Sequence, residues 1–118
     1  MGHRKIAFIH GEASYITRVR VASFRRSYAE HGMDMPESYL CEAFYNDGVT
    51  TASAVRELLS LPDPPTCILF PDDCAYVYAR RELETLGCPL PPQLGVAGFD
   101  GVSLVQAMQP QLTTYWQD

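Results

Sequence analysis

Lysine is nearly missing from this chain of 118 residues, in which Lys5 is the only one. Lysine and arginine together number 9 against 14 acidic residues, so the net charge is −5. No run of basic side chains occurs, which argues against a chain that grips a nucleic-acid backbone through general electrostatics. The sequence also has no apolar run near the ~18 residues that a membrane-spanning helix needs, and no apolar signal-peptide region at its start.

Cysteine pairs at metal or redox spacing are missing as well. None of the four cysteines forms a Cys-x-x-Cys motif, so we expect a reduced, cytoplasmic chain rather than a disulfide scaffold. Cys41 and Cys67 fall in apolar runs, which predicts buried thiols. The histidines His3, His10 and His31 are too scattered for a local metal motif.

Catalytic signatures are equally scarce. The sequence has no Gly-x-Ser-x-Gly motif, no glycine-rich phosphate loop and no paired histidine and cysteine nucleophile. We therefore expect no enzyme activity and no cofactor.

The order of apolar runs and helix-period segments predicts one α/β domain. Strands are expected over residues 5–9, 39–44, 66–70, 94–99 and 112–116. Helices are expected over residues 16–31, 50–60, 73–86 and 102–108. The first has an apolar face of Val21, Phe24 and Tyr28 and is expected to stop at Gly32, and the inner stripe of the third is Ala75, Ala79, Leu83 and Leu86. Strict alternation predicts a parallel sheet with helices on both faces and right-handed crossovers. Five strands favour the flavodoxin-like order 2-1-3-4-5.

The third strand ends in Pro71, Asp72 and Asp73. A continuous apolar run is typical of a parallel strand buried on both faces. Asp73 sits where the third helix begins, so we expect it to cap that helix. Asp72 has no equally simple structural role, and we expect it to contact a ligand.

Polar and aromatic side chains follow the other strands, and parallel strands bring their carboxyl ends to one edge. Asp100 is expected to contact a ligand there, whereas Asp47 before Gly48 is expected to be a cap or turn residue. Arg20 and Tyr45 can serve the same edge, although a solvated charge and simple packing are the alternatives. Such a mixture of donors, acceptors and rings suits a sugar.

A magnesium site is the alternative use of acids at strand ends. Phosphoryl-transfer domains of this topology need a carboxylate pair after the first strand and a lysine after a later one. Here the first strand ends in His10-Gly11, and no lysine follows Lys5. The magnesium interpretation is therefore disfavoured.

Five stretches in order resemble the effector-binding domain of the LacI/GalR family of bacterial transcription regulators. They are Gly2–Ile9, Thr17–Phe24, Leu58–Asp73 with its Pro-Asp-Pro-Pro-Thr segment, Gly95–Gly101, and Pro110–Thr114 followed by Gln117. Together they cover almost the whole chain, so the resemblance is specific.

The resemblance implies a set of effector-binding residues. Arg20 matches an arginine that hydrogen-bonds effector hydroxyls, and Asp100 matches an acid that does the same. Tyr45 lies where an aromatic ring often stacks on the ligand, and Gln117 matches a polar residue of the same cleft. Asp72 occupies a position that is commonly asparagine, so here the group accepts hydrogen bonds only.

Two further departures from the family pattern are Ser23 and Thr50, at positions where glycine is usual. They affect the expected identity of the effector more than the expected fold.

The resemblance also implies an architecture. Residues 1–118 would form the C-terminal lobe of a periplasmic-binding-protein-like effector domain, without the helix-turn-helix DNA reader and the N-terminal lobe. Its effector would be a sugar or a nucleoside-like molecule, and DNA would be contacted only through the missing headpiece. The alternatives are a lobe of a periplasmic-type sugar-binding protein and, more distantly, a magnesium-dependent enzyme of flavodoxin-like fold.

The family usually dimerises through helices that follow the later strands. This implies a homodimer surface near Val77, Tyr78, Leu104 and Met108, with burial in the ordinary core as the alternative for these apolar residues.

Overall fold

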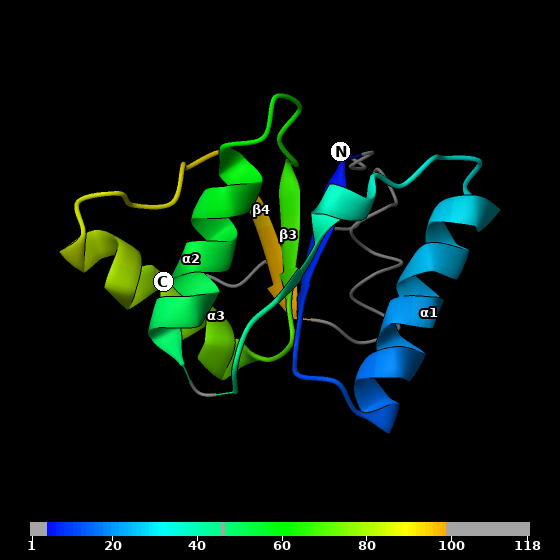
Figure 1. Cartoon of the computed structure of the whole chain (residues 1–118). Helices are drawn as coiled ribbons and strands as arrows, with labels where there is room; N and C mark the ends of the chain where they lie inside the picture. The colour runs from blue at the N-terminus through cyan, green and yellow to red at the C-terminus, as the bar shows by residue number, and fades with distance from the viewer. Residues whose placement is uncertain (1–4, 46, 99–118) are drawn as a thin grey trace.

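The computed structural model of the chain describes residues 5–45 and 47–98 (Figure 1). Its elements in order are β1 (Ile6–His10), α1 (Tyr15–Glu30), the 3-10 helix η1 (Glu37–Tyr39), β2 (Leu40–Glu42), α2 (Gly48–Leu59), β3 (Cys67–Phe70), α3 (Asp73–Thr85) and β4 (Gly95–Gly98). Each predicted element within the described residues is therefore present, although the predicted second strand is shortened to three residues.

The four strands form one parallel sheet in the order β2-β1-β3-β4. This confirms the predicted order for the first four strands. Ile6 lies opposite Cys67 and Cys67 lies opposite Gly95, which fixes the register across the sheet. The predicted strand 112–116 and helix 102–108 lie outside the described residues.

Helices cover both faces of this sheet, as predicted. α2 and α3 pack side by side on one face, and α1 lies on the other (Figure 1). The strands alternate between the two cores: Ile9, Ile68 and Phe70 face α2 and α3, whereas Phe8 and Leu69 face α1. Burial on both faces explains why β1 and β3 read as continuous apolar runs.

The apolar face of α1 was predicted correctly. Phe24 and Tyr28 are fully buried, and Gly32 adopts φ 67° where the helix stops. In α3, Ala79 and Leu83 are buried as expected. Leu86, however, was wrongly predicted to be buried: it is 49% exposed because the helix ends at Thr85.

Tyr28 completes the hydrogen bonding of β1 at a place where β2 does not reach. The first residue of β2 lies opposite Phe8, so Ile6 has no partner on that side of the strand. The Tyr28 hydroxyl donates to the Ile6 carbonyl and accepts from the Ile6 N–H, both at 2.7 Å. Burial raises the pKa of Tyr28 to about 12.

The two thiols predicted to be buried are buried. Burial raises the pKa of Cys67 to about 12. Burial, with a smaller contribution from the Glu57 carboxylate, raises the pKa of Cys41 to about 11. Both groups therefore remain protonated and unreactive at neutral pH.

None of the helices in the described ranges is long and apolar enough to span a membrane.

Candidate functional site

The carboxyl ends of β1, β2 and β3 meet at one edge of the sheet, and a helix starts from each of them (Figure 1). Ser14, Asp47 and Asp72 are the caps of α1, α2 and α3. Each side chain accepts backbone N–H groups that would otherwise lack a partner in the first helical turn. The edge is therefore built from three capped helix starts.

Asp72, not Asp73, caps α3, so the expected capping role of Asp73 is wrong. Asp72 has an extended backbone, with φ −162° and ψ 174°, and its Oδ1 accepts the Ala75 N–H at 2.8 Å. Asp73 is exposed in the first helical turn, where its charge faces the positive end of the helix dipole. Asp72 is half-buried. Of its two carboxylate oxygens, only Oδ1 accepts a hydrogen bond from another described residue.

The cap assignment gives a direct test. Asp72→Ala should lower the free energy of unfolding by about 1 kcal/mol, whereas Asp72→Asn should change it by only a few tenths, because asparagine caps as well as aspartate. Asp73→Ala, which removes only a dipole interaction, should cost about 0.5 kcal/mol. Urea denaturation followed by circular dichroism measures all three. A larger loss for Asp73→Ala than for Asp72→Ala would contradict the assignment.

Asp47 caps α2, as predicted. Its Oδ1 accepts the N–H groups of Val49 at 3.0 Å and Thr50 at 3.2 Å. The Thr50 hydroxyl in turn accepts the Phe44 N–H at 3.0 Å. Threonine at this position therefore holds the chain that leaves β2, which gives a structural role to one departure from the family pattern.

Arg20 reaches from α1 to the end of β3. Its Nη1 donates to the Pro71 carbonyl at 3.3 Å, across 51 residues of sequence. The guanidinium is half-buried and lies beside the residue that precedes Asp72. The structure thus brings one predicted site residue, Arg20, to the backbone next to another, Asp72.

Tyr45 lies on the same edge with its side chain at the surface. It is 75% exposed, and its backbone N–H donates to the Glu12 Oε1 at 3.5 Å. The neighbouring Phe44, predicted to be part of the second strand, lies past the strand end and is 54% exposed. Sequence reasoning missed this second aromatic, and the Asp47-Gly48 turn signal could have shown that the strand stops early.

The remaining predicted site residues, Asp100 and Gln117, lie outside the described residues, as do Leu104 and Met108 of the predicted dimer surface. Within residues 5–45 and 47–98, no three side chains of the types that bind metals come together.

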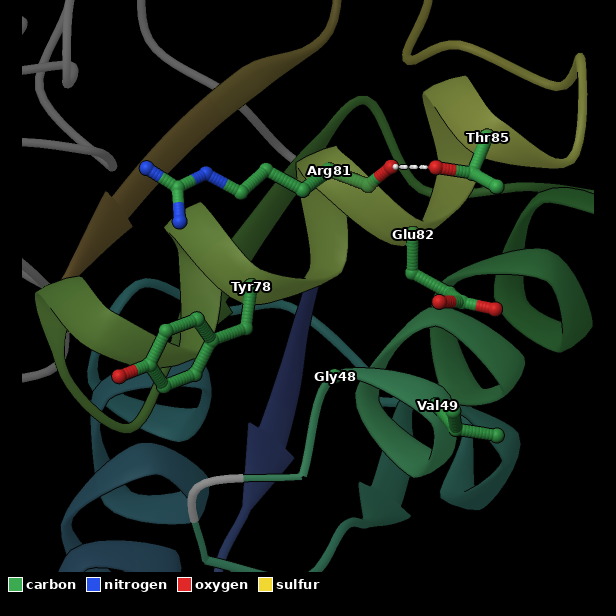
Figure 2. A pocket seen from close by; sticks show the side chains of 6 residues that line it. All are labelled: Gly48, Val49, Tyr78, Arg81, Glu82 and Thr85. Carbon is green, nitrogen blue, oxygen red and sulfur yellow. Dashed lines mark hydrogen bonds between the residues drawn. The ribbon is translucent and has the colours of Figure 1, made fainter.

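The predicted dimer surface on α3 borders a groove of about 360 Å³ between α3 and the start of α2 (Figure 2). Its lining is Gly48, Val49, Tyr78, Arg81, Glu82 and Thr85. Tyr78 reaches the surface, whereas Val77 is half-buried against the core that α2 and α3 share. Of these two predicted contact residues, Tyr78 is the more accessible.

Comparison with known proteins shows which family the chain resembles. Residues 1–118 match the family model of the periplasmic binding protein-like domain. Catabolite control protein A of Priestia megaterium is 30% identical over 120 residues, which cover 98% of this chain and 35% of that protein. The repressor CytR of Escherichia coli K12 is 27% identical over 117 residues, or 98% of this chain and 34% of that protein. The chain therefore spans about a third of the length of the curated relatives it matches.

Solved structures similar to this chain are also transcription regulators. A sugar-binding regulator of the LacI family from Escherichia coli, complexed with phosphate, matches with a TM-score of 0.70 and 26% identity over 91% of this chain and 40% of that chain. The regulator CelR in complex with cellobiose matches with a TM-score of 0.66 and 26% identity over 94% of this chain and 34% of that chain. Both share the parallel α/β fold described above.

Proposed function

This chain belongs to the periplasmic binding protein-like domain family, and from that membership we propose that it is the effector-binding lobe of a LacI-type transcription regulator. The resemblance seen in the sequence is confirmed, because the relatives are LacI-type repressors and regulators. The proposed ligand is a sugar or a nucleoside-like molecule, which agrees with the cellobiose bound in one structural relative. The parent protein would work in the cytoplasm, where its DNA is.

The contact between Arg20 and the end of β3 carries this proposal. The hydrogen bond to Pro71 holds a guanidinium, which has several N–H donors, beside the backbone that leads into Asp72, whose carboxylate only accepts hydrogen bonds. Vicinal hydroxyls of a sugar can both accept from such a donor and donate to such an acceptor. The exposed ring of Tyr45 offers a flat apolar surface nearby. Asp100 and Gln117 would complete the set.

The proposed action is a shift between two states and involves no chemistry on the ligand. Since ligands bind α/β sheets at their carboxyl edge, an effector held there can also touch a second lobe facing that edge. Its binding would then favour one arrangement of the lobes over another and change the affinity for DNA. The net charge of −5 fits a segment that does not itself hold DNA. A homodimer through the α3 surface near Tyr78, with Leu104 and Met108, would transmit the change.

Calorimetric titration of the protein that carries this chain tests the site. Cellobiose, ribose and adenosine serve as probes, and the ligand that binds is titrated into variants. We expect Arg20→Ala and Asp100→Ala each to weaken binding at least ~10-fold, because each removes a hydrogen bond to a desolvated ligand group. Arg26→Ala, which removes an exposed arginine from the same helix, should leave the affinity unchanged. Undiminished binding in both site variants would rule out the assignment.

A further inference from the structure

A second groove lies on the side of the sheet away from α2 and α3, between α1 and the edge strand β2. It has a volume of about 440 Å³. Val21 and Ala22 of α1 and Leu40 of β2 give it an apolar floor, and Arg18 and Arg25 line it from α1. His10 and Glu42 close the end near the carboxyl edge of the sheet. Neither arginine is among the residues of the proposed effector site.

The helix that forms one wall is strongly basic. α1 carries Arg18, Arg20, Arg25 and Arg26 against the single acid Glu30, although the whole chain has a net charge of −5. Four of its nine basic residues are thus concentrated in one helix. Two of these arginines, Arg18 and Arg25, line the groove against the one acid Glu42, so its lining favours an acidic occupant.

The two arginines of the groove differ in what they bind. Arg25 forms a forked ion pair with Glu37, with Nη2 to Oε1 at 2.8 Å and Nη1 to Oε2 at 2.5 Å, which ties α1 to the 3-10 helix before β2. This pair raises the pKa of Arg25 and lowers the pKa of Glu37, in both cases chiefly through the hydrogen bonds between them. Arg18 is exposed and forms no ion pair with any other described residue. Arg25 is therefore engaged by Glu37, while Arg18 offers a charge to an occupant.

The other wall is a strand edge. Within the described sheet β2 is the terminal strand and pairs only with β1. A strand in this position presents backbone donors and acceptors to which another extended chain can pair. The three residues of β2 span about 10 Å, and the seven positions from Arg18 to Arg25 span about the same distance along the helix. The spacing of the two arginines along α1 therefore matches the length of β2.

We propose that this groove binds an extended acidic segment of a partner protein, which pairs with the edge of β2 and places a carboxylate on Arg18. Alternating side chains of such a segment point in opposite directions. One set of these side chains packs on the apolar floor formed by Val21 and Leu40, and the backbone of the segment lies against β2. This binding surface is separate from the effector site and does not depend on the proposed function.

Fluorescence anisotropy of the whole 118-residue chain tests the proposal with labelled hexapeptides. The probe alternates valine and glutamate, and its matched control alternates valine and lysine. We expect the glutamate peptide to bind at least ~10-fold more tightly than the lysine peptide, with an affinity that falls as salt is added. Methylation of alternate backbone nitrogens in the glutamate peptide should abolish binding, since it removes the donors that pair with a strand.

Two neutralising variants should act in opposite directions, which a folding defect cannot imitate. Arg18→Gln should weaken binding of the glutamate peptide several-fold, and Glu42→Gln should strengthen it by removing a repulsive charge. Arg26→Gln makes the same charge change as Arg18→Gln at a position outside the groove lining and should have little effect. Equal binding by the wild-type chain and Arg18→Gln, equal binding of the methylated peptide, or full competition by free glutarate would each overturn the proposal.

Discussion

Tyr28→Phe is expected to lower the free energy of unfolding by about 2–6 kcal/mol, although it removes a single oxygen atom. The hydroxyl is the partner of both backbone groups of Ile6, at 2.7 Å each, and Ile6 is fully buried. Its removal leaves a buried N–H and a buried carbonyl without partners, and each such group costs about 1–3 kcal/mol. Urea denaturation followed by circular dichroism measures the change.

Tyr39→Phe is the matched control. The Tyr39 side chain is also buried, but its hydroxyl makes one hydrogen bond, to the Asp63 carbonyl at 2.7 Å. Tyr39→Phe should therefore lower the free energy of unfolding by about 1 kcal/mol. If Tyr28→Phe cost no more than Tyr39→Phe, the hydroxyl of Tyr28 would not be the partner that β1 requires.

The pH dependence of stability gives a second measure of the same group. Tyr28 ionises near pH 10 in the unfolded chain and near 12 in the folded one, because burial disfavours its charged form. The unfolded state thus loses its proton first, and the contribution of Tyr28 to stability falls as the pH rises from 10 to 12. Tyr28→Phe should flatten the pH dependence in this range. Cys41 and Cys67 also have raised pKa values, so their contributions to the pH dependence remain in the variant.

Gly48→Val is expected to cost about 3 kcal/mol, and Gly48→Ala about 1–2 kcal/mol, through overpacking. A Cβ atom at Gly48 would lie 2.9 Å from the Tyr78 carbonyl oxygen and 3.2 Å from the Tyr78 Cβ. α2 begins at Gly48 and packs closely on α3, and Figure 2 shows Gly48 beneath the helix that carries Tyr78. The backbone of Tyr78 cannot move aside without shifting α3.

Ser53 provides the comparison within the same helix. It is exposed, so Ser53→Val should change the free energy of unfolding by about 0.5 kcal/mol or less, the cost of helix propensity alone. Ser53→Ala should be neutral or slightly stabilising. The usual gain from replacing glycine with alanine in a helix would be seen at Gly48 only if the close approach to α3 were wrong.

The fold could be predicted well from the sequence because its signals are strong and independent of one another. Buried parallel strands give unbroken apolar runs, as in Cys67–Phe70, and glycines such as Gly32 mark helix ends. The strand order then follows from the alternation of strands and helices. That Asp72 rather than Asp73 caps α3 could not be predicted, because adjacent acids before a helix compete for the cap and the backbone conformation decides between them.

The edge of the sheet that carries the candidate site was predictable, but the contacts of the residues there were not. The sequence places Arg20 in the first helix, but the bond to Pro71 depends on how α1 crosses the sheet. The exposure of Phe44 depends on where β2 stops pairing with β1, which the turn signal at Asp47-Gly48 indicates only approximately. Contacts between residues far apart in the sequence depend on the tertiary arrangement, whereas the positions of helix starts and ends are signalled by the local sequence.

The strand order has a consequence for how the chain is made. β1 is synthesised first but lies between β2 and β3, and Cys67, the partner of Ile6 on β3, follows it by 61 residues. At bacterial and eukaryotic synthesis rates this interval lasts about 3–12 s. Until β2 has been made, the apolar residues Ile6–Ile9, fully buried in the finished fold, have no neighbouring strand of this sheet to pair with, and one side of β1 stays unpaired until β3 follows. The nascent chain thus exposes an apolar strand to chaperones or to neighbouring chains on the ribosome. The rate of translation through residues 10–67 therefore affects the yield of folded protein.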